Sequence, residues 1–272
     1  MSTFRDFELG RWEDPGVCSA YLDRVGPVVV QVMGHMLSAV AVGPRDRLLD
    51  VATGSGTVAS AAAARGADAV GVDFSAEQLR RARLYHPDLT FRQGEAEALP
   101  FDPETFDVVV CNFGAPHFPD PEGFFADSLR VLRPGGRFAF TVWAPPEQTK
   151  AFGAVLAAVA EHGVLDVGLP AGPNFFLHAD ADTARASLVA TGFDAVEVST
   201  VAQTWELVGE DDVFEAILTG TARTSALLQL QEAHALTRIR LAVREAMLEY
   251  RGDDDTYRIP MPAVLVTGVK PA

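Results

Sequence analysis

The chain is poor in cysteine, with only Cys18 and Cys111 among its 272 residues. Two cysteines this far apart provide neither a metal-binding spacing nor a disulfide framework, and they are interpreted as free thiols in a reducing compartment. No apolar run approaches the roughly 20 residues that a membrane-spanning helix needs. The first residues, MSTFRDFELG, lack the basic and apolar regions of a secretory signal. These absences predict a cytoplasmic protein with no metal site and no membrane span.

Basic residues are also scarce. Lysine and arginine number 22 against 37 aspartates and glutamates, a net charge of −15. Proteins that track nucleic acid usually carry a basic surface, because phosphate neutralisation supplies most of their affinity. The best candidate for a basic patch, Arg80, Arg81 and Arg83, is interpreted as the solvated face of a helix. We therefore predict a small-molecule substrate and no nucleic-acid partner, whereas the choice between monomer and homodimer is left open by the sequence.

Strands and helices alternate in the first two thirds of the chain. The apolar runs predict strands at 47–52, 69–73, 89–92, 106–112 and 138–143, with helices between them. This order predicts a doubly wound α/β sheet covered on both faces. Further on, the pattern predicts a helix from Asp180 to Gly192, a strand at 195–205, helices within 210–250 and a last strand at 264–266.

The first strand leads into a turn that contains Gly54 and Gly56. Glycine lets a backbone approach a ligand closely, and ligands of open α/β sheets bind beyond the carboxyl ends of the strands. The second strand ends at Asp73, 19 residues after Gly54, where a carboxylate can accept the hydroxyls of an adenosine ribose. The same turn, continued to Ala59, also fits the dinucleotide fingerprint. The turn and Asp73 are therefore compatible with either S-adenosylmethionine or a dinucleotide as the ligand.

Five segments in register carry a family resemblance. The segment Leu48–Gly56 resembles the first motif of class I S-adenosylmethionine-dependent methyltransferases, in the branch of the ubiquinone and menaquinone C-methyltransferases (methyltransferase type 11). The later segments Gly71–Ser75, Gly94–Phe101, Phe106–Gly114 and Leu132–Phe138 resemble the motifs that follow it. The resemblance implies a Rossmann-like, mostly parallel seven-stranded sheet with an antiparallel last strand and a helical cap.

The resemblance also implies an organisation for the whole chain. A single methyltransferase domain would span 1–272, with an N-terminal helical arm at 1–44 and a cofactor-binding core at 45–145. The substrate-side half would follow at 146–272, with a helical insertion at about 207–252.

By the same resemblance, particular residues would hold the cofactor. Asp50 and the backbone of Ala52, Gly54 and Gly56 would line its methionine end, and Asp73 would bind its ribose. Thr53 and Phe74 would also contact the cofactor. Adenine would meet Glu95 and Ala96, and the sulfonium would face Asn112 and Phe113. In the arm, Trp12 and Tyr21 resemble the aromatic positions that cover the cofactor; packing of the arm onto the sheet is the alternative. The chain departs from the family at Ala52, where glycine is frequent, and at Glu95, where aspartate is common.

Histidine and phenylalanine residues supply candidates for the acceptor side. His117 follows the fourth strand closely, and we predict it as a general base, because histidine accepts a proton near neutral pH. His178 is a weaker candidate and is interpreted as a surface residue before a helix. Phe118, Phe175 and Phe176 are predicted to line an apolar acceptor pocket, with Phe113 beside them.

The sequence thus predicts methyl transfer from S-adenosylmethionine, with S-adenosylhomocysteine as product, to a small and aromatic or lipophilic acceptor such as a secondary metabolite or a quinone-like ring. One alternative is a non-methylating member of the fold that acts as a cyclase or senses the cofactor. The other is a nicotinamide dehydrogenase, which the segments 94–101 and 132–138 disfavour. The acceptor, and whether oxygen, nitrogen or carbon is methylated, stay undetermined.

Overall fold

A computed structural model describes residues 3–272, which form two compact units of three chain segments each. The first, here the sheet unit, comprises Val29–Trp143, Gly172–Val201 and Ala263–Ala272. The second, here the helical unit, comprises the residues up to Val28, Ala144–Ala171 and Ala202–Pro262. The chain crosses between them five times, so neither is a continuous piece of sequence. That both belong to one domain stays a prediction.

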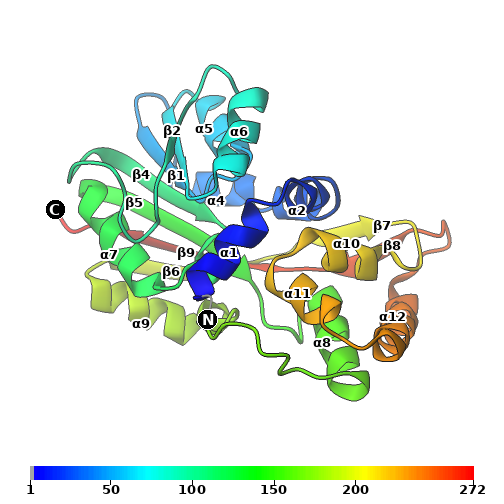
Figure 1. The fold of residues 1–272 in the computed structure, drawn as a ribbon. Helices are drawn as coiled ribbons and strands as arrows, with labels where there is room; N and C mark the ends of the chain where they lie inside the picture. The colour runs from blue at the N-terminus through cyan, green and yellow to red at the C-terminus, as the bar shows by residue number, and fades with distance from the viewer. Residues whose placement is uncertain (1–2) are drawn as a thin grey trace. The chain divides into compact units, whose positions relative to one another are not determined.

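A seven-stranded sheet, in the order β3-β2-β1-β4-β5-β9-β6, forms the centre of the sheet unit (Figure 1). The strands β1 to β5 are parallel, and β9 pairs antiparallel with both β5 and β6. This confirms the predicted mostly parallel sheet with an antiparallel last strand. Its strands are β1 (Arg47–Val51), β2 (Asp68–Asp73), β3 (Thr90–Gln93), β4 (Phe106–Asn112), β5 (Leu132–Trp143), β6 (Asp194–Val201) and β9 (Ala263–Val269).

Helices cover both faces of this sheet because the central strands are apolar on both sides. Val108 and Val110 of β4 pack in one cluster with α4 (Met33–Ala39), α5 (Thr57–Ala63) and α6 (Ala76–Tyr85). On β5, Phe138 and Phe140 contact Phe125 of α7 (Pro121–Val131), and Phe138 stacks on Phe193, which follows α9 (Ala181–Thr191). Phe138 pairs in register with Val109, which points to the opposite face from Val108 and Val110. The two groups of helices therefore cover opposite faces, and the sheet is doubly wound.

Local sequence signals set the helix boundaries as predicted. Ser75 caps α6 by accepting from the backbone N–H of Gln78 at 3.1 Å. Asp120 caps α7 by accepting from Gly123, and Asp180 caps α9 by accepting from Thr183. After α9, Gly192 takes a φ of +112°, a left-handed conformation that ends helices at glycine.

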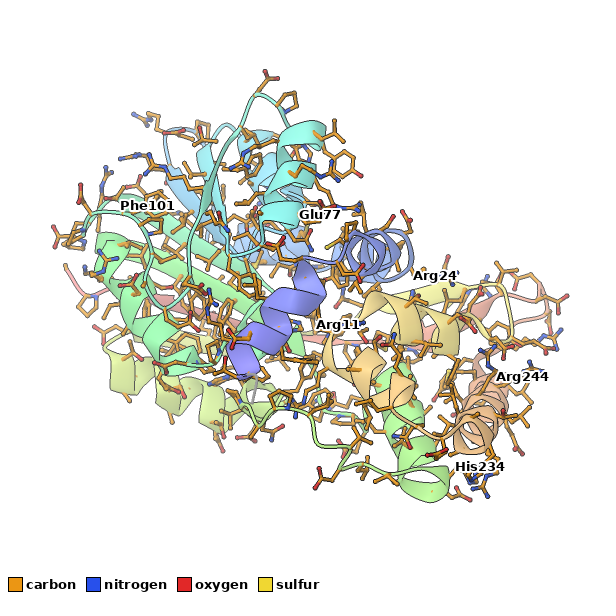
Figure 2. All side chains as sticks on the ribbon, viewed as in Figure 1. Arg11, Arg24, Glu77, Phe101, His234 and Arg244 are labelled. Atoms are coloured by element: carbon orange, nitrogen blue, oxygen red, sulfur yellow. The ribbon has the colours of Figure 1, made fainter. Side chains whose placement is uncertain are left out.

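Helices and a two-stranded antiparallel sheet make up the helical unit. On α12 the buried Ile239, Val243 and Met247 form most of the predicted apolar stripe, whereas Arg244 on the same helix pairs with Asp211 at 2.8 Å (Figure 2). The elements are α1 (Phe4–Trp12), α2 (Pro15–Ala20), a π-helical turn (Tyr21–Val25), α3 (Gly26–Val29, whose last residue belongs to the sheet unit), α8 (Lys150–His162), α10 (Asp212–Gly220), α11 (Arg223–Gln229), α12 (Ala233–Met247), β7 (Thr204–Leu207) and β8 (Tyr257–Pro260).

Two strand predictions were wrong in extent. The single strand expected at 195–205 is two strands: β6 pairs with β9 in the large sheet, whereas β7 pairs with β8 in a separate two-stranded sheet. Periodicity cannot reveal such a change of partner, because both strands alternate in the same way. Strand β5 begins at Leu132 rather than at Phe138, because Leu132 already pairs with Phe106 before a register shift over the Pro134–Gly136 segment.

Candidate functional site

The Asp50 carboxylate connects the end of β1 to the following helix through hydrogen bonds. Asp50 is 1% exposed, and its Oδ2 accepts from the Thr53 hydroxyl at 2.6 Å and from the Ala59 backbone N–H at 3.0 Å. Among residues 3–272 no group lies within hydrogen-bonding reach of Asp50 Oδ1. Burial, with a smaller contribution from the Asp73 carboxylate, raises the pKa of Asp50 to about 7. Asp50 therefore holds the glycine turn in shape and retains one unused acceptor.

The turn after β1 has a strained backbone. Ala52, Gly54 and Gly56 have φ values of +55°, +54° and +83°, and residues with side chains rarely adopt such values. At Gly56 an added Cβ would also lie 2.8 Å from Cζ of Phe91, so both the conformation and the space require glycine. The predicted departure at Ala52 thus takes up a left-handed conformation that glycine would adopt at lower cost.

Asp73, at the end of β2, is bound to the same turn. Its Oδ2 accepts from the Gly54 N–H at 2.9 Å, and its Oδ1 accepts from the Ser75 N–H at 3.0 Å. The side chain is 5% exposed. Phe74 follows it, and the Phe74 carbonyl accepts from the Gln93 side chain of β3. The structure therefore brings together the predicted residues Asp50, Thr53, Gly54 and Asp73.

The carboxyl ends of β1 and β4 meet beside this turn. A Cβ added to Gly114, just after β4, would lie 2.6 Å from Cβ of Ala52. Phe113 has a φ of +56°, so the chain bends sharply here as it does at Ala52. The chain builds strands outward from β1 on one side and from β4 on the other, which makes this the switch point of strand order, where open α/β sheets bind ligands.

The predicted adenine residues follow β3. Gly94 donates its backbone N–H to the Asp73 carbonyl, which holds this segment beside the end of β2. Ala96 is buried and Glu95 is half-buried. Next to them, burial and the nearby Glu95 and Asp120 carboxylates raise the pKa of Glu97, against hydrogen bonds that lower it. The adenine role of Glu95 stays a prediction.

The predicted acceptor-side residues occupy two environments. His117 ends a short 3₁₀ turn (Ala115–His117), and its ring lies 5.7 Å edge-on from Phe175, which contacts Phe176 in turn. Phe118 instead packs on Phe124 of α7 and is 8% exposed. His117, Phe175 and Phe176 thus form one half-buried group, whereas Phe118 belongs to the packing against α7.

The expected surface position of His178 is wrong. This side chain is 4% exposed and lies edge-on to the rings of Phe125 and Phe140. Burial lowers its pKa, although Glu122, with Oε1 3.8 Å from Nε2, acts in the opposite direction. A position just before a helix looks exposed in the sequence, but packing of the turn at Leu177–Ala179 against β5 buries it.

Tyr21 belongs to the helical unit. It opens the π-helical turn, a feature frequent at functional sites. Its ring lies edge-on to Trp12 at 5.2 Å, and Trp12 donates to the buried Glu8 carboxylate at 3.2 Å. Burial raises the pKa of the Tyr21 phenol. Its predicted cofactor contact stays a prediction.

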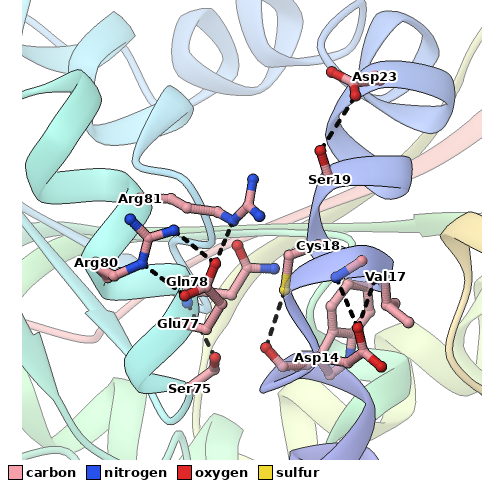
Figure 3. A network of polar contacts seen from close by, with 12 residues as sticks. Asp14, Val17, Cys18, Ser19, Asp23, Ser75, Glu77, Gln78, Arg80 and Arg81 are labelled. Atoms are coloured by element: carbon pink, nitrogen blue, oxygen red, sulfur yellow. Dashed lines mark hydrogen bonds and ion pairs between the residues drawn. The ribbon is translucent and has the colours of Figure 1, made fainter.

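The arginine cluster on α6 is only partly solvated, contrary to expectation. Glu77 accepts from Arg80 Nε at 2.7 Å and from Arg81 Nε at 2.8 Å (Figure 3). The hydrogen bond from Arg80 and, to a smaller extent, that from Arg81 lower the pKa of Glu77 to about 2, although burial acts in the opposite direction. Arg83 donates to the Phe91 carbonyl. One of the three positive charges is therefore neutralised within the helix.

Two residues of the site were not predicted from the sequence. Thr141 and Trp143, near the end of β5, contact Asn112 and Phe113 across the β4–β5 pairing. They lie in a segment that the family motifs do not reach, so only their position at the carboxyl end of a strand could have indicated them.

Two further properties concern the whole described chain. Within residues 3–272, no three histidine, cysteine, aspartate or glutamate side chains are grouped so that they could hold a metal ion. In the same range, none of the helices combines the length and the apolar composition needed to cross a bilayer.

Comparison with known proteins gives the relationship of the chain. Residues 49–140 match the family model described as a methyltransferase domain. A demethylmenaquinone methyltransferase of Renibacterium salmoninarum is 38% identical over 111 residues, which are 41% of this chain and 47% of that protein. The chain therefore spans about half the length of such curated relatives.

Two other comparisons extend further. The crystal structure of Haemonchus contortus phosphoethanolamine N-methyltransferase 2 in complex with S-adenosyl-L-methionine shares the fold, with a TM-score of 0.62 and 21% identity over all of this chain and 61% of that one. A demethylmenaquinone methyltransferase of Clavibacter sepedonicus is 35% identical over 171 residues, 58% of this chain and 70% of that protein. The chain therefore belongs to the class I S-adenosylmethionine-dependent methyltransferases, in the methyltransferase type 11 branch.

Proposed function

We propose that the protein binds S-adenosylmethionine and transfers its methyl group to a small aromatic acceptor of the quinol type. The observation that carries this proposal is the pair Asp50 and Asp73, fastened on either side of the Gly54–Gly56 turn at the switch point of the sheet. Family membership and the five motifs in register support the same activity. The relatives' name, demethylmenaquinone methyltransferase, supports the acceptor class.

The residues present fit this cofactor. Backbone N–H groups of Gly54 and Ser75 fix the Asp73 carboxylate at the end of β2, which is where a ribose hydroxyl would be accepted. A Cβ added to Gly54 would make only an ordinary van der Waals contact, with Gln78 Oε1 at 3.9 Å, so the backbone of Gly54 is not crowded by its neighbours. The unused Oδ1 of Asp50 offers a hydrogen-bonding site for a polar group of the cofactor at the buried end of the turn. Asp73 would bind the ribose, and Asp50 together with the Gly54–Gly56 turn would bind the methionine end.

The acceptor class follows from the chemistry of the cofactor and from the aromatic side chains. When bound, S-adenosylmethionine supplies an electrophilic methyl group, so the acceptor must be electron-rich. A hydroquinone meets this requirement better than the corresponding quinone. On the protein side, Phe113 and Trp143 stack at 4.2 Å, and Phe175 with Phe176 forms a second aromatic pair. Such surfaces favour a flat ring.

A direct assay tests the proposal. The full chain is incubated with methyl-labelled S-adenosylmethionine and a naphthohydroquinone that carries one prenyl chain. We expect equal amounts of labelled product and S-adenosylhomocysteine. Binding of both adenosyl ligands without transfer to naphthohydroquinone, phenol or amine acceptors would instead support the non-methylating alternative. Binding of NAD with no adenosyl ligand bound would support a dehydrogenase.

His117 is proposed as the general base that takes a proton from the acceptor hydroxyl. His117 lies four residues after Phe113 in the sequence, and its ring lies edge-on to that of Phe175. His117→Ala should lower kcat by about 100-fold, the range of a lost general base, without weakening S-adenosylmethionine binding. His234→Ala, on the exposed side of α12 (Figure 2), serves as the matched control. A wild-type rate in the His117 variant would exclude the base role.

A further inference from the structure

A fully buried hydroxyl joins the ends of β4 and β5. Thr141 is 0% exposed, and its Oγ1 donates to Asn112 Oδ1 at 2.7 Å. The same oxygen accepts from the Phe113 backbone N–H at 3.0 Å, and the Thr141 carbonyl accepts from that N–H at 3.1 Å. One side chain therefore fixes both the amide of Asn112 and the backbone of Phe113.

The amide of Asn112 is held at its other end too. Its Nδ2 donates to the carbonyl of Val29, the last residue of α3, at 3.1 Å. A carbonyl at the end of a helix has no partner inside the helix, so the asparagine satisfies it. With Oδ1 on Thr141 and Nδ2 on Val29, the amide of Asn112 is engaged by the protein itself. Both polar atoms of the Asn112 side chain are therefore fixed in position by the protein.

The residue fixed by these bonds is conformationally unusual. Phe113 has a φ of +56°, a region that bulky residues seldom occupy and that persists where surrounding contacts enforce it. Two contacts do so here: the bonds of its N–H to Thr141, and the stacking of its ring on Trp143 at 4.2 Å. Strained residues of this kind cluster at functional sites, and this one stands at the switch point of the sheet.

We propose that Thr141 and Asn112 act as positioning residues for methyl transfer. They hold Phe113 in its left-handed conformation, and this sets the direction of the Gly114–His117 segment that follows. In that segment His117 donates its backbone N–H to the Gly114 carbonyl at 2.9 Å, which closes the turn between these two residues. The assignment rests on the proposed function, because it concerns the acceptor side of the same site.

The test removes the hydroxyl at constant shape. Thr141→Val should lower kcat with the naphthohydroquinone by up to about 100-fold, the cost of displacing a reacting group by about an ångström. The affinity for S-adenosylhomocysteine should stay within about threefold, since the Asp50–Asp73 side is untouched. Thr141→Ser keeps the hydroxyl and should restore the rate. Thr149→Val is the matched control, because Thr149 is equally buried and its hydroxyl donates to the carbonyls of Ala144 and Pro145.

A readout independent of turnover separates this inference from the proposed function. The chain has three tryptophans, so fluorotryptophan labelling gives three fluorine resonances, and Trp143→Phe identifies that of Trp143. Thr141→Val should shift the Trp143 resonance, whereas Thr149→Val should not. If wild type binds no adenosyl ligand, the proposed function fails and the role in methyl transfer fails with it, whereas the Trp143 resonance still shows whether Thr141 holds the Phe113–Trp143 pair in place. An unshifted Trp143 resonance, or an active wild type matched in rate by Thr141→Val, would overturn it.

Discussion

Asp73→Ala is expected to weaken S-adenosylmethionine binding by about 100-fold or more. In the wild type, the Asp73 carboxylate accepts from Gly54 and Ser75 and is buried at the end of β2. Hydrogen bonds to charged groups contribute about 1.5–3 kcal/mol each, and 2.7 kcal/mol corresponds to a factor of about 100. Alanine removes the proposed ribose acceptor and also releases the Gly54 N–H that the carboxylate holds in place.

Calorimetric titration of wild type and variant with S-adenosylmethionine and S-adenosylhomocysteine measures this loss. Asp107→Ala is the matched control. Asp107 also accepts a backbone N–H, from Arg47, and pairs with Arg133 at 2.8 Å, but it lies near the amino end of β4. We expect the control to bind both ligands as wild type does. Equal affinities in the folded Asp73 variant would contradict the assignment of Asp73 to the ribose.

The second large effect is a pH dependence of stability at Asp50. Burial, assisted by the Asp73 carboxylate, raises the folded-state pKa of Asp50 from 3.8 to about 7, although bonds from Thr53 and Ala59 lower it. A carboxyl with a raised pKa favours the folded state below its unfolded pKa, and this contribution is lost as the pH rises to the folded pKa. Relative to Asp50→Asn, the wild-type free energy of unfolding should fall by on the order of 1 kcal/mol per pH unit between about pH 5 and 7, and level off above.

Urea denaturation of both proteins at several pH values between about 5 and 8 measures this difference. Asp211→Asn is the opposite-sign control. Hydrogen bonds from Arg244 hold the pKa of Asp211 below its ordinary value, so the stabilisation is present above the unfolded pKa and is lost only at lower pH. The difference between wild type and the Asp211 variant should therefore be constant over this range. A constant difference for Asp50→Asn as well would exclude a raised pKa.

Features that depend on neighbours in the sequence could be predicted from it. The helix caps at Ser75, Asp120 and Asp180 form between residues three apart, and the apolar runs of β1 and β4 mark buried strands wherever they occur. The glycine turn is of the same kind, because its conformation is set within a few residues. For this reason the sequence alone predicts the order of elements, the sheet class and the residues around Asp50 and Asp73.

Features that depend on pairing between distant segments required the tertiary structure. The sequence does not indicate that Asn112 would be engaged by Thr141 and Val29, 29 and 83 residues away. It also places His178 at the surface, where packing against Phe125 and Phe140 in fact buries it. The sequence by itself determined which residues can bind the cofactor, since those signals are local. Only the tertiary structure decided which side chains hold others in position, because burial and hydrogen-bond partners are fixed by contacts that form when remote strands and helices pack together.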